Sequence, residues 1–327
     1  MILAVSPPAR TSASCFDAGS KYCPCDLAAL GCCVACSLLR GDEKCDCGWS
    51  GLCIYQDYLR NGRAPKPRRK KVLAPVRSRA DLASGGGGGK NRAFIVEIEV
   101  PREVSHWCVF PGSFALLRPP GSPERFNVPL SVMEAKDGAL SFALEVKGPK
   151  TVALDRACAA GRSVTAVAPF WSGLQGAASL RRYSSGRVLA VAKGIAQAPI
   201  LHTGQYVTGH GGFFKALLGP GTLGAVFVDD ALSRSGAQVA VLPKSKDHNI
   251  ARIYGELVGG DYDLLVSEGS DKQHGALQEL LSSLDDPPAL AWSSNVSMTC
   301  AEGICGACLR DGSRGCKADL GVGGLST

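Results

Sequence analysis

Four cysteines near the end of the chain constrain its structure more than any other feature. They are Cys300, Cys305, Cys308 and Cys316, and the first three have the spacing C-x4-C-x2-C. Three thiols from one short loop can converge on a common centre only if the backbone curls tightly. Gly303 and Gly306 permit this because they have no Cβ. The more distant fourth cysteine can then close the cage.

This spacing is typical of plant-type [2Fe–2S] sites. We therefore expect the four cysteines to ligate a [2Fe–2S] cluster. A zinc site built from C-x2-C pairs is the alternative, but this part of the chain has no second pair of that kind. An iron–sulfur cluster passes single electrons, which favours a redox protein.

A second group of cysteines lies near the start of the chain. Residues 1–60 contain nine of the fifteen cysteines, between Cys15 and Cys53. Their C-x-C pairs and the dipeptide Cys32-Cys33 match no standard spacing, but they suit a soft metal held by thiolates. So small a module with few large apolar residues needs such a staple to fold. We expect a cysteine-rich metal-binding module, with zinc or a further iron–sulfur cluster both open.

A disulfide framework would require export, and the start of the chain is a poor export signal. No Lys or Arg precedes the short apolar run Ile2–Val5, and Pro7 and Pro8 interrupt it. The sequence has no run of about 18 apolar residues, so we expect no transmembrane helix. We therefore expect a cytoplasmic protein, in which clustered cysteines more often bind metals than form disulfides.

Residues 61–90 are predicted to be a linker. The segment contains much of the positive charge of a chain whose net charge is +7, and it ends in five glycines, Gly85–Gly89. Most of its basic residues are crowded before the glycines: Arg63, Lys66, Arg68, Arg69, Lys70, Lys71, Arg77 and Arg79. A solvated tether is the main interpretation and docking of an acidic partner the alternative. Aromatic residues are not interleaved, so no nucleic-acid partner is expected.

Residues 91–185 show the pattern of a small antiparallel β-barrel. Short β-branched and apolar segments separated by Pro and Gly predict strands. The expected strands are Phe94–Val100, Phe114–Leu117, Leu140–Val146 and Ser163–Val167.

The pattern changes near Gly186, and residues 186–292 are predicted to form an α/β domain. Buried strands alternating with helices indicate a parallel sheet. The strands expected are Arg187–Ala192, Gly224–Val228, Val239–Pro243 and Tyr262–Val266, and the helices are Asn249–Val258 and His274–Leu284. With residues 293–327 as the cluster region, the fold class is multidomain α+β.

Several short segments at the ends of these strands carry recognisable motifs. In chain order they are Pro111–Phe114 (P-G-S-F), Asn127–Val132 (N-V-P-L-S-V), Gly148–Thr151 (G-P-K-T), Pro169–Gly173 (P-F-W-S-G), Lys193–Pro199 (K-G-I-A-Q-A-P) and Ser267–Asp271 (S-E-G-S-D). Small residues after a strand let backbone amides approach a phosphate.

From about Ala93 to Cys316, these motifs and their order resemble the electron-transfer subunit of dihydroorotate dehydrogenase and its sulfide-dehydrogenase-like relatives. Those proteins belong to the ferredoxin–NADP reductase superfamily. The N-terminal segments Cys15–Cys25, Cys45–Trp49 and Cys53–Gln56 are similar to an extension of some of these relatives. The resemblance implies a flavin-binding barrel, a nicotinamide-nucleotide-binding domain and a C-terminal [2Fe–2S] motif, and it points to pyrimidine biosynthesis as one pathway.

The resemblance also implies roles for individual residues. FAD would contact Pro129, Leu130, Ser131, Val132, Gly148 and Thr151, and the nicotinamide nucleotide would contact Gly194, Ala196, Pro199 and Gly269. The chain departs from the family where Val128 replaces an Arg that pairs with flavin phosphate, so Arg125 or Lys147 would have to supply the charge. Lys193 and Ala196 replace two family glycines.

Two motif residues have a plainer interpretation beside the family one. Arg182–Ser184 looks like the reductase flavin signature R-x-Y-S, but it falls after the barrel, so we expect a surface segment. Trp171 either shapes the flavin environment or is a core residue.

Together these features predict a flavoprotein oxidoreductase. Nicotinamides move two electrons, iron–sulfur clusters move one and flavin handles both, so electrons would pass between NAD(P)H, FAD, the [2Fe–2S] cluster and a partner subunit or carrier protein. No catalytic acid or base is demanded. The alternative is an iron–sulfur or zinc scaffold whose reductase body no longer works. The choice between NADH and NADPH is open.

Overall fold

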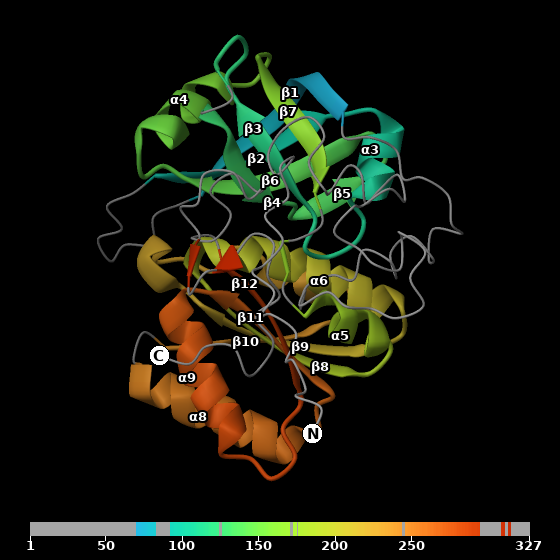
Figure 1. The fold of residues 1–327 in the computed structure, drawn as a ribbon, viewed down its shortest axis with the longest axis vertical. Helices are drawn as coiled ribbons and strands as arrows, with labels where there is room; N and C mark the ends of the chain where they lie inside the picture. The colour runs from blue at the N-terminus through green and yellow to red at the C-terminus, as the bar shows by residue number, and fades with distance from the viewer. Residues whose placement is uncertain are drawn as a thin grey trace, which may run out of the picture.

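A computed structural model describes residues 70–82, 92–123, 126–170, 173–174, 176–243, 246–294, 309–310 and 313–314. These residues form an antiparallel domain and, beside it, a parallel sheet flanked by helices (Figure 1). The cysteine-rich module and all four expected cluster ligands lie outside the described residues. In the described part, no helix is long and apolar enough to cross a membrane.

The antiparallel domain is a seven-stranded sheet in the order β4-β3-β7-β1-β2-β6-β5 among the described strands. Its strands are β1 Lys70–Leu82, β2 Ala93–Glu99, β3 Phe114–Arg118, β4 Val128–Ser131, β5 Glu134–Lys136, β6 Ala139–Glu145 and β7 Ser163–Phe170, and its helices are α3 Arg102–Trp107 and α4 Pro149–Ala157. The sheet curls because the chain leaving β4 reaches β6, where the Met133 amide donates to the Ser141 carbonyl at 2.8 Å. The expected antiparallel barrel is confirmed as a curled sheet.

Strand β1 corrects the prediction of a linker over residues 61–90, because its 13 residues are an inner strand of this sheet. Lys70–Pro75 pair with β7, and the strand then passes to β2 across a register shift between Val76 and Ser78. Ala74 and Val76 are buried, whereas most other residues of β1 are exposed or half-buried. The strand therefore buries too few side chains to show the alternation by which a half-buried strand is recognised in a sequence.

Two cations assigned to the solvated tether are instead part of this domain. The Arg79 guanidinium lies 2.9 Å from the buried Asp155 carboxylate and 3.9 Å from the centre of the Phe94 ring. Arg77 lies 3.7 Å from Glu99 on the neighbouring strand. These contacts hold the basic residues against the barrel.

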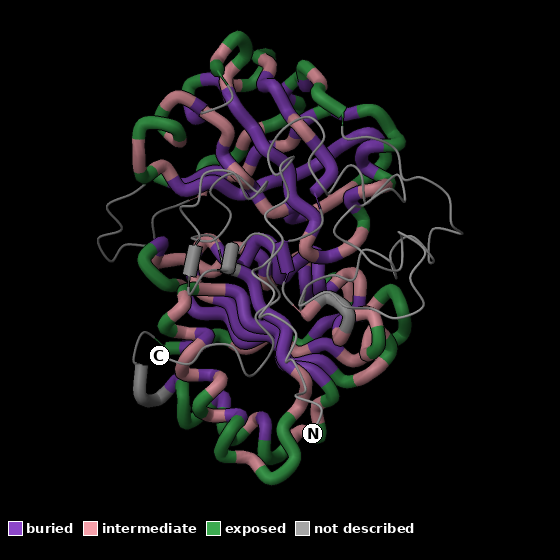
Figure 2. Tube along the Cα trace, in the orientation of Figure 1, coloured by how far each residue is buried: buried purple, intermediate pink, exposed green. Residues whose placement is uncertain are grey.

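The second domain is a five-stranded parallel sheet in the order β10-β9-β8-β11-β12. Its elements are β8 Arg187–Lys193, β9 Phe213–Gly219, β10 Gln238–Val241, β11 Leu264–Gly269, β12 Ala289–Ser294, α5 Ala177–Arg182, α6 Gln197–Gly209, α7 Asp229–Arg234, α8 Lys246–Gly260 and α9 Asp271–Ser282, with short 3-10 turns η3 Gly194–Ala196 and η4 Gly221–Leu223. One apolar core joins the sheet to α6 and α7, and another joins its opposite face to α8 and α9. Figure 2 shows the strands of this sheet buried between the two layers.

One strand prediction in this domain is wrong. Gly224–Val228 forms no strand, and the sheet instead takes the preceding segment, β9, which the sequence pattern did not identify. Both segments are short and apolar, so periodicity cannot separate them. The helix α6 ends at Gly209, and the chain reaches the sheet again at Phe213, which leaves β9 as the strand that pairs with β8.

Helix α6 joins the two domains (Figure 1). His202 on this helix donates from Nε2 to the Val109 carbonyl of the antiparallel domain at 3.0 Å. Gln205 donates to the Glu134 carboxylate at 2.9 Å, and the rings of Phe110 and Tyr206 meet edge to face at 5.3 Å. The relative position of the two sheets is thus fixed by hydrogen bonds as well as by packing.

The assignment of β1 to the barrel core predicts a sharp contrast between two substitutions. Val76→Asp places a carboxylate in the core and should lower the free energy of unfolding by about 3 kcal/mol or more. Leu73→Asp is the matched control, because Leu73 is 66% exposed and its change should stay within about 0.5 kcal/mol. Urea denaturation measures both, and equal small effects would restore the linker interpretation.

His202 predicts a pH dependence of stability. Burial lowers its pKa to about 4, against the opposing effect of its backbone hydrogen bond to Val109. Below pH 6.5 the imidazole is protonated in the unfolded chain but stays neutral in the folded chain. The free energy of unfolding therefore falls by roughly 3 kcal/mol as the pH drops from above 6.5 to 4. His202→Gln should flatten this part of the profile, and denaturation curves from pH 4 to 7 that stay parallel to wild type would contradict it.

Candidate functional site

The parallel sheet has a topological switch point between β8 and β11. From β8 the chain proceeds outward to β9 and β10, and it then crosses back to β11 on the other side of β8 before reaching β12. In open parallel sheets, ligands bind outside the carboxyl ends of the strands at such a reversal. The segments after β8 and β11 are Lys193–Pro199 and Gly269–Asp271, two of the motifs found in the sequence.

Two glycine turns pack against each other at this edge. Gly194 begins η3 with a φ of +60°, and Gly221 begins η4 with a φ of +55°. A Cβ on Gly221 would lie 2.7 Å from the Gly194 nitrogen, so no other residue fits there without a shift. Ala196 is buried at the end of η3, and Pro199 lies in the first turn of α6, where a missing N–H breaks no helical hydrogen bond.

Gln197 holds this edge in shape, a role that sequence analysis missed. Its fully buried side-chain amide donates to the carbonyls of Gly219 and Ala225 at 3.1 and 3.0 Å, and its oxygen accepts from the Phe227 amide at 3.1 Å. The loop after β9 is therefore tied to the first residue of α6. In the sequence, the signal for this role is a single polar Gln inside a turn of small residues.

The end of β11 is built around Gln273. Its side-chain nitrogen lies 3.3 Å from the Val191 carbonyl, 3.2 Å from the Ser267 hydroxyl and 3.2 Å from the Glu268 carbonyl. A Cβ on Gly269 would lie 2.8 Å from this side chain. Because Gly269 has no Cβ, it leaves space for the Gln273 side-chain amide, which links the carbonyls of β8 and β11 at the switch point.

Glu268 is the unusual residue of this edge. It is 2% exposed, and no described group forms a hydrogen bond with its Oε2 atom. Burial raises its pKa well above 4.5, which favours the neutral form of the side chain. In register, Glu268 lies directly between Ala192 of β8 and Ser293 of β12.

In the antiparallel domain, Phe114 brings three of the sequence motifs together. It pairs with Ser131 on one side and with Phe170 on the other, and its ring stacks on the Phe170 ring at 4.9 Å. The Val132 amide donates to the Ser113 carbonyl at 2.9 Å. Leu130 and Val132 are buried and Pro129 and Ser131 half-buried, so Pro129 and Ser131 keep some surface for a ligand.

The motif Gly148–Thr151 forms the start of α4 rather than a free turn. The Thr151 hydroxyl accepts from the amides of Lys147 and Gly148 at 2.9 Å and donates to the Gly148 carbonyl at 2.9 Å. A Cβ on Gly148 would meet nothing within 4 Å, so the space in front of the helix is open. The first turn of a helix presents amides without helical partners, which favours an anion.

The structure brings the expected site residues together in two groups. Gly194, Ala196, Pro199 and Gly269 share the edge of the parallel sheet, and Pro129, Leu130 and Ser131 lie on β4, with Val132 directly after it. Val128 is buried and apolar, and Lys147 pairs with Glu145 at 2.8 Å. Arg125, Trp171 and the cluster cysteines lie outside the described residues, and within the described ones no group of His, Cys, Asp or Glu could hold a metal ion.

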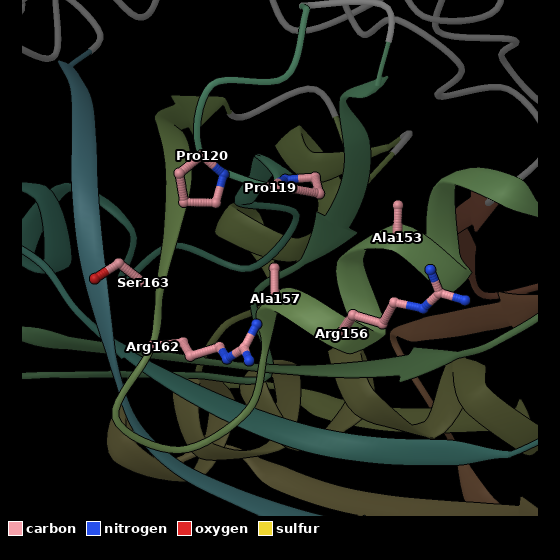
Figure 3. A pocket seen from close by; sticks show the side chains of 7 residues that line it. All are labelled: Pro119, Pro120, Ala153, Arg156, Ala157, Arg162 and Ser163. Atoms are coloured by element: carbon pink, nitrogen blue, oxygen red, sulfur yellow. The ribbon is translucent and has the colours of Figure 1, made fainter.

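A separate concavity of about 370 Å³ lies on the antiparallel domain (Figure 3). It lies between the second half of α4 and the residues that follow β3, and its lining includes the two cations Arg156 and Arg162. This concavity contains none of the expected site residues. The switch point remains the better candidate, because its position follows from the sheet topology.

Comparison with known proteins gives fold relatives only. No family model matches the chain, and no curated protein matches it. Among solved structures, it is similar to an NADH-dependent reduced ferredoxin–NADP oxidoreductase described with flavin-based electron bifurcation, at 19% identity and a TM-score of 0.56, over 73% of this chain and 82% of that one.

Two further solved structures are similar. One is the ferredoxin reductase in carbazole 1,9a-dioxygenase, at 15% identity and a TM-score of 0.51 over 71% of both chains. The other is an Amycolatopsis cytochrome P450 reductase, at 14% identity and a TM-score of 0.51 over 69% of this chain and 70% of that one. The chain therefore has the two-domain fold of the ferredoxin–NADP reductase type.

Glu268 predicts a second pH effect, opposite in sign to that of His202. Its folded-state pKa is raised by burial, so the stability that the neutral side chain provides is present below pH 4.5 and is lost as the pH rises toward the folded-state value. Relative to wild type, Glu268→Gln should gain stability above pH 4.5 by up to about 1.4 kcal/mol per pH unit. Urea denaturation between pH 5 and 8 measures the difference, and a difference that stays constant over this range would contradict the raised pKa of Glu268 in the folded state.

Proposed function

We propose that this protein is a flavin-dependent oxidoreductase that passes electrons between NAD(P)H and a partner protein through a [2Fe–2S] cluster. The observation that carries the proposal is the placement of a glycine-rich switch point on a parallel sheet directly beside an antiparallel barrel, with α6 between the two. Similar structures with this arrangement are named as NADH- or ferredoxin-linked reductases.

The barrel residues fit a flavin. The half-buried Pro129 and Ser131 offer backbone and hydroxyl groups beside the packed Phe114. The open space in front of Gly148 and the first-turn amides of α4 fit a phosphate group. Because β6 runs antiparallel to the chain that continues β4, the end of β6 that leads to Gly148 lies toward the start of β4. The β4 residues Pro129 and Ser131 and the open space in front of Gly148 therefore lie at the same end of the barrel.

The switch point fits a nicotinamide nucleotide. Gly194, directly after β8, has no Cβ and leaves the backbone open where a dinucleotide approaches the carboxyl end of the sheet, and Gly269 at the carboxyl end of β11 makes room for Gln273. Lys193 adds a positive charge at the same edge, where the family has a glycine. The helix α6 begins directly after η3, and its N-terminal end favours a negative charge.

The cluster proposal rests on the donor set and on one described contact. Cys300, Cys305, Cys308 and Cys316 provide four thiolates, the donors that iron–sulfur clusters require. Strand β13 Leu309–Arg310 pairs with β14 Ser313–Arg314, and Leu309 lies opposite Arg314. In the sequence, Cys308 directly precedes this hairpin and Cys316 follows it by two residues.

With these groups bound, flavin supplies the step between two-electron and one-electron carriers. The protein contributes positions: β8 and β11 for the nucleotide, β4 and α4 for the flavin, and the cysteine loop for the cluster. A partner subunit or electron-carrier protein exchanges electrons with the cluster. A role like that of the dihydroorotate dehydrogenase electron-transfer subunit, in the cytoplasm, is the specific form of the proposal.

A scaffold protein with an inactive reductase body is the second candidate. It is favoured by Val128, which is buried and apolar where the family pairs an Arg with flavin phosphate. Lys147, the other cation near this motif, already pairs with Glu145. In this case the purified protein would contain cluster but no flavin.

Anaerobic purification and absorption spectroscopy test the proposal. Wild type should show flavin bands that bleach with NADH or NADPH, together with cluster absorbance and acid-labile sulfide. Cys305→Ser should lose the cluster signals and keep the flavin bleaching, because only the cluster loses a ligand.

Cys108→Ala is the matched control. Cys108 is fully buried, and burial raises the pKa of its thiol to about 12, so it does not provide a thiolate. This variant should retain both flavin and cluster. Cluster absorbance without flavin in the wild type would favour the scaffold, and flavin without sulfide would refute the cluster.

A further inference from the structure

Glu268 has a position that its packing does not explain. An unpartnered buried polar atom costs free energy, and native proteins rarely keep one without a functional reason. Here the atom belongs to a carboxyl group at the carboxyl end of β11, one strand away from the glycine turn that follows β8. The residue is therefore placed where the sheet topology predicts a ligand.

Side chains alternate between the two faces of the sheet along β11, and this alternation shows on which face Glu268 lies. Ser267 bonds to His274 of α9 at 2.8 Å, so it lies on the face covered by α9. Leu264 and Val266 lie in the core shared with α6, and Glu268 has the same parity. Its carboxyl group thus lies on the face covered by α6, which is also the face that meets the antiparallel domain.

The same face brings the barrel close to the switch point. Met133 and Ala143 of the antiparallel domain belong to the core that contains Ala192, the residue beside Glu268 on β8. Gln197, the polar residue that opens α6, is already saturated by its three hydrogen bonds. Among the described residues of this face, Glu268 is thus left with a carboxyl oxygen to offer a ligand.

We infer that Glu268 binds the carboxamide of the nicotinamide ring through the carboxyl group that carries the unpartnered buried oxygen. The inference rests on the proposed function and names a residue for it. A protonated carboxyl presents a donor and an acceptor side by side, and a carboxamide presents the matching acceptor and donor. Burial raises the pKa of this carboxyl group, which favours its protonated form.

Glutamine keeps one donor and one acceptor at the same distance from the backbone, whereas alanine keeps neither. The test measures the affinity of the full-length protein for NAD+ and for ADP-ribose, which lacks the nicotinamide ring, by isothermal titration calorimetry. Glu268→Ala should weaken NAD+ binding at least tenfold and leave ADP-ribose binding within twofold. Glu268→Gln should keep NAD+ binding within threefold of wild type.

Glu256→Gln is the matched control, because it removes a carboxylate from α8 on the opposite layer, where Glu256 pairs with Lys215 at 2.7 Å. Its affinities for both ligands should equal those of wild type. Flavin content, measured on each purified variant, should be the same throughout, and thermal unfolding verifies that each variant is folded.

The outcomes separate the inference from the proposed function. If wild type binds neither NAD+ nor ADP-ribose, the proposed function itself fails. If wild type binds both and Glu268→Ala binds NAD+ equally well, the carboxyl group is satisfied by water and the inference is overturned. Equal losses for both ligands, or a loss of flavin instead, would also overturn it, because the contact would then not be with the nicotinamide ring.

Discussion

The structure depends on helix α6, which is buried on both sides. One side packs on the parallel sheet, and the other forms hydrogen bonds with the antiparallel domain through His202 and Gln205. Because α6 begins at the glycine turn after β8, fixing the helix also fixes that turn relative to the barrel. A ligand that spans both domains therefore meets a site whose halves are already positioned, and less conformational entropy is lost on binding.

Polar groups at the switch point are divided between structure and binding. Gln197 and Gln273 use their side-chain amides to tie neighbouring loops and strands to the sheet. The carboxyl group of Glu268 has no described partner at Oε2, on the face toward the barrel. A rigid edge with one unsatisfied group favours binding of a ligand whose own hydrogen-bonding groups match it.

The sequence predicted the strands whose apolar residues are continuous or alternate, such as β2, β6 and β8. It missed β1, because this strand buries few apolar side chains and contains a proline at the point where it changes partner. It also placed a strand at Gly224–Val228 instead of β9, since two apolar runs of similar length cannot be ranked without the sheet that selects one of them. The sequence placed Glu268 in the motif Ser267–Asp271 but gave it no role of its own, because a sequence does not show which side chains are buried.

By itself, the sequence determined the division into an antiparallel and a parallel part, the glycine turn after β8 and the spacing of the four C-terminal cysteines, since these depend on local periodicity and on residue types with special backbone freedom. The tertiary structure decided that the basic segment Lys70–Leu82 is an inner strand, that Gln197 closes the loop after β9, and that Glu268 is buried beside the switch point. These features arise from contacts between residues far apart in the chain, whose free energy exists only once the sheets have formed.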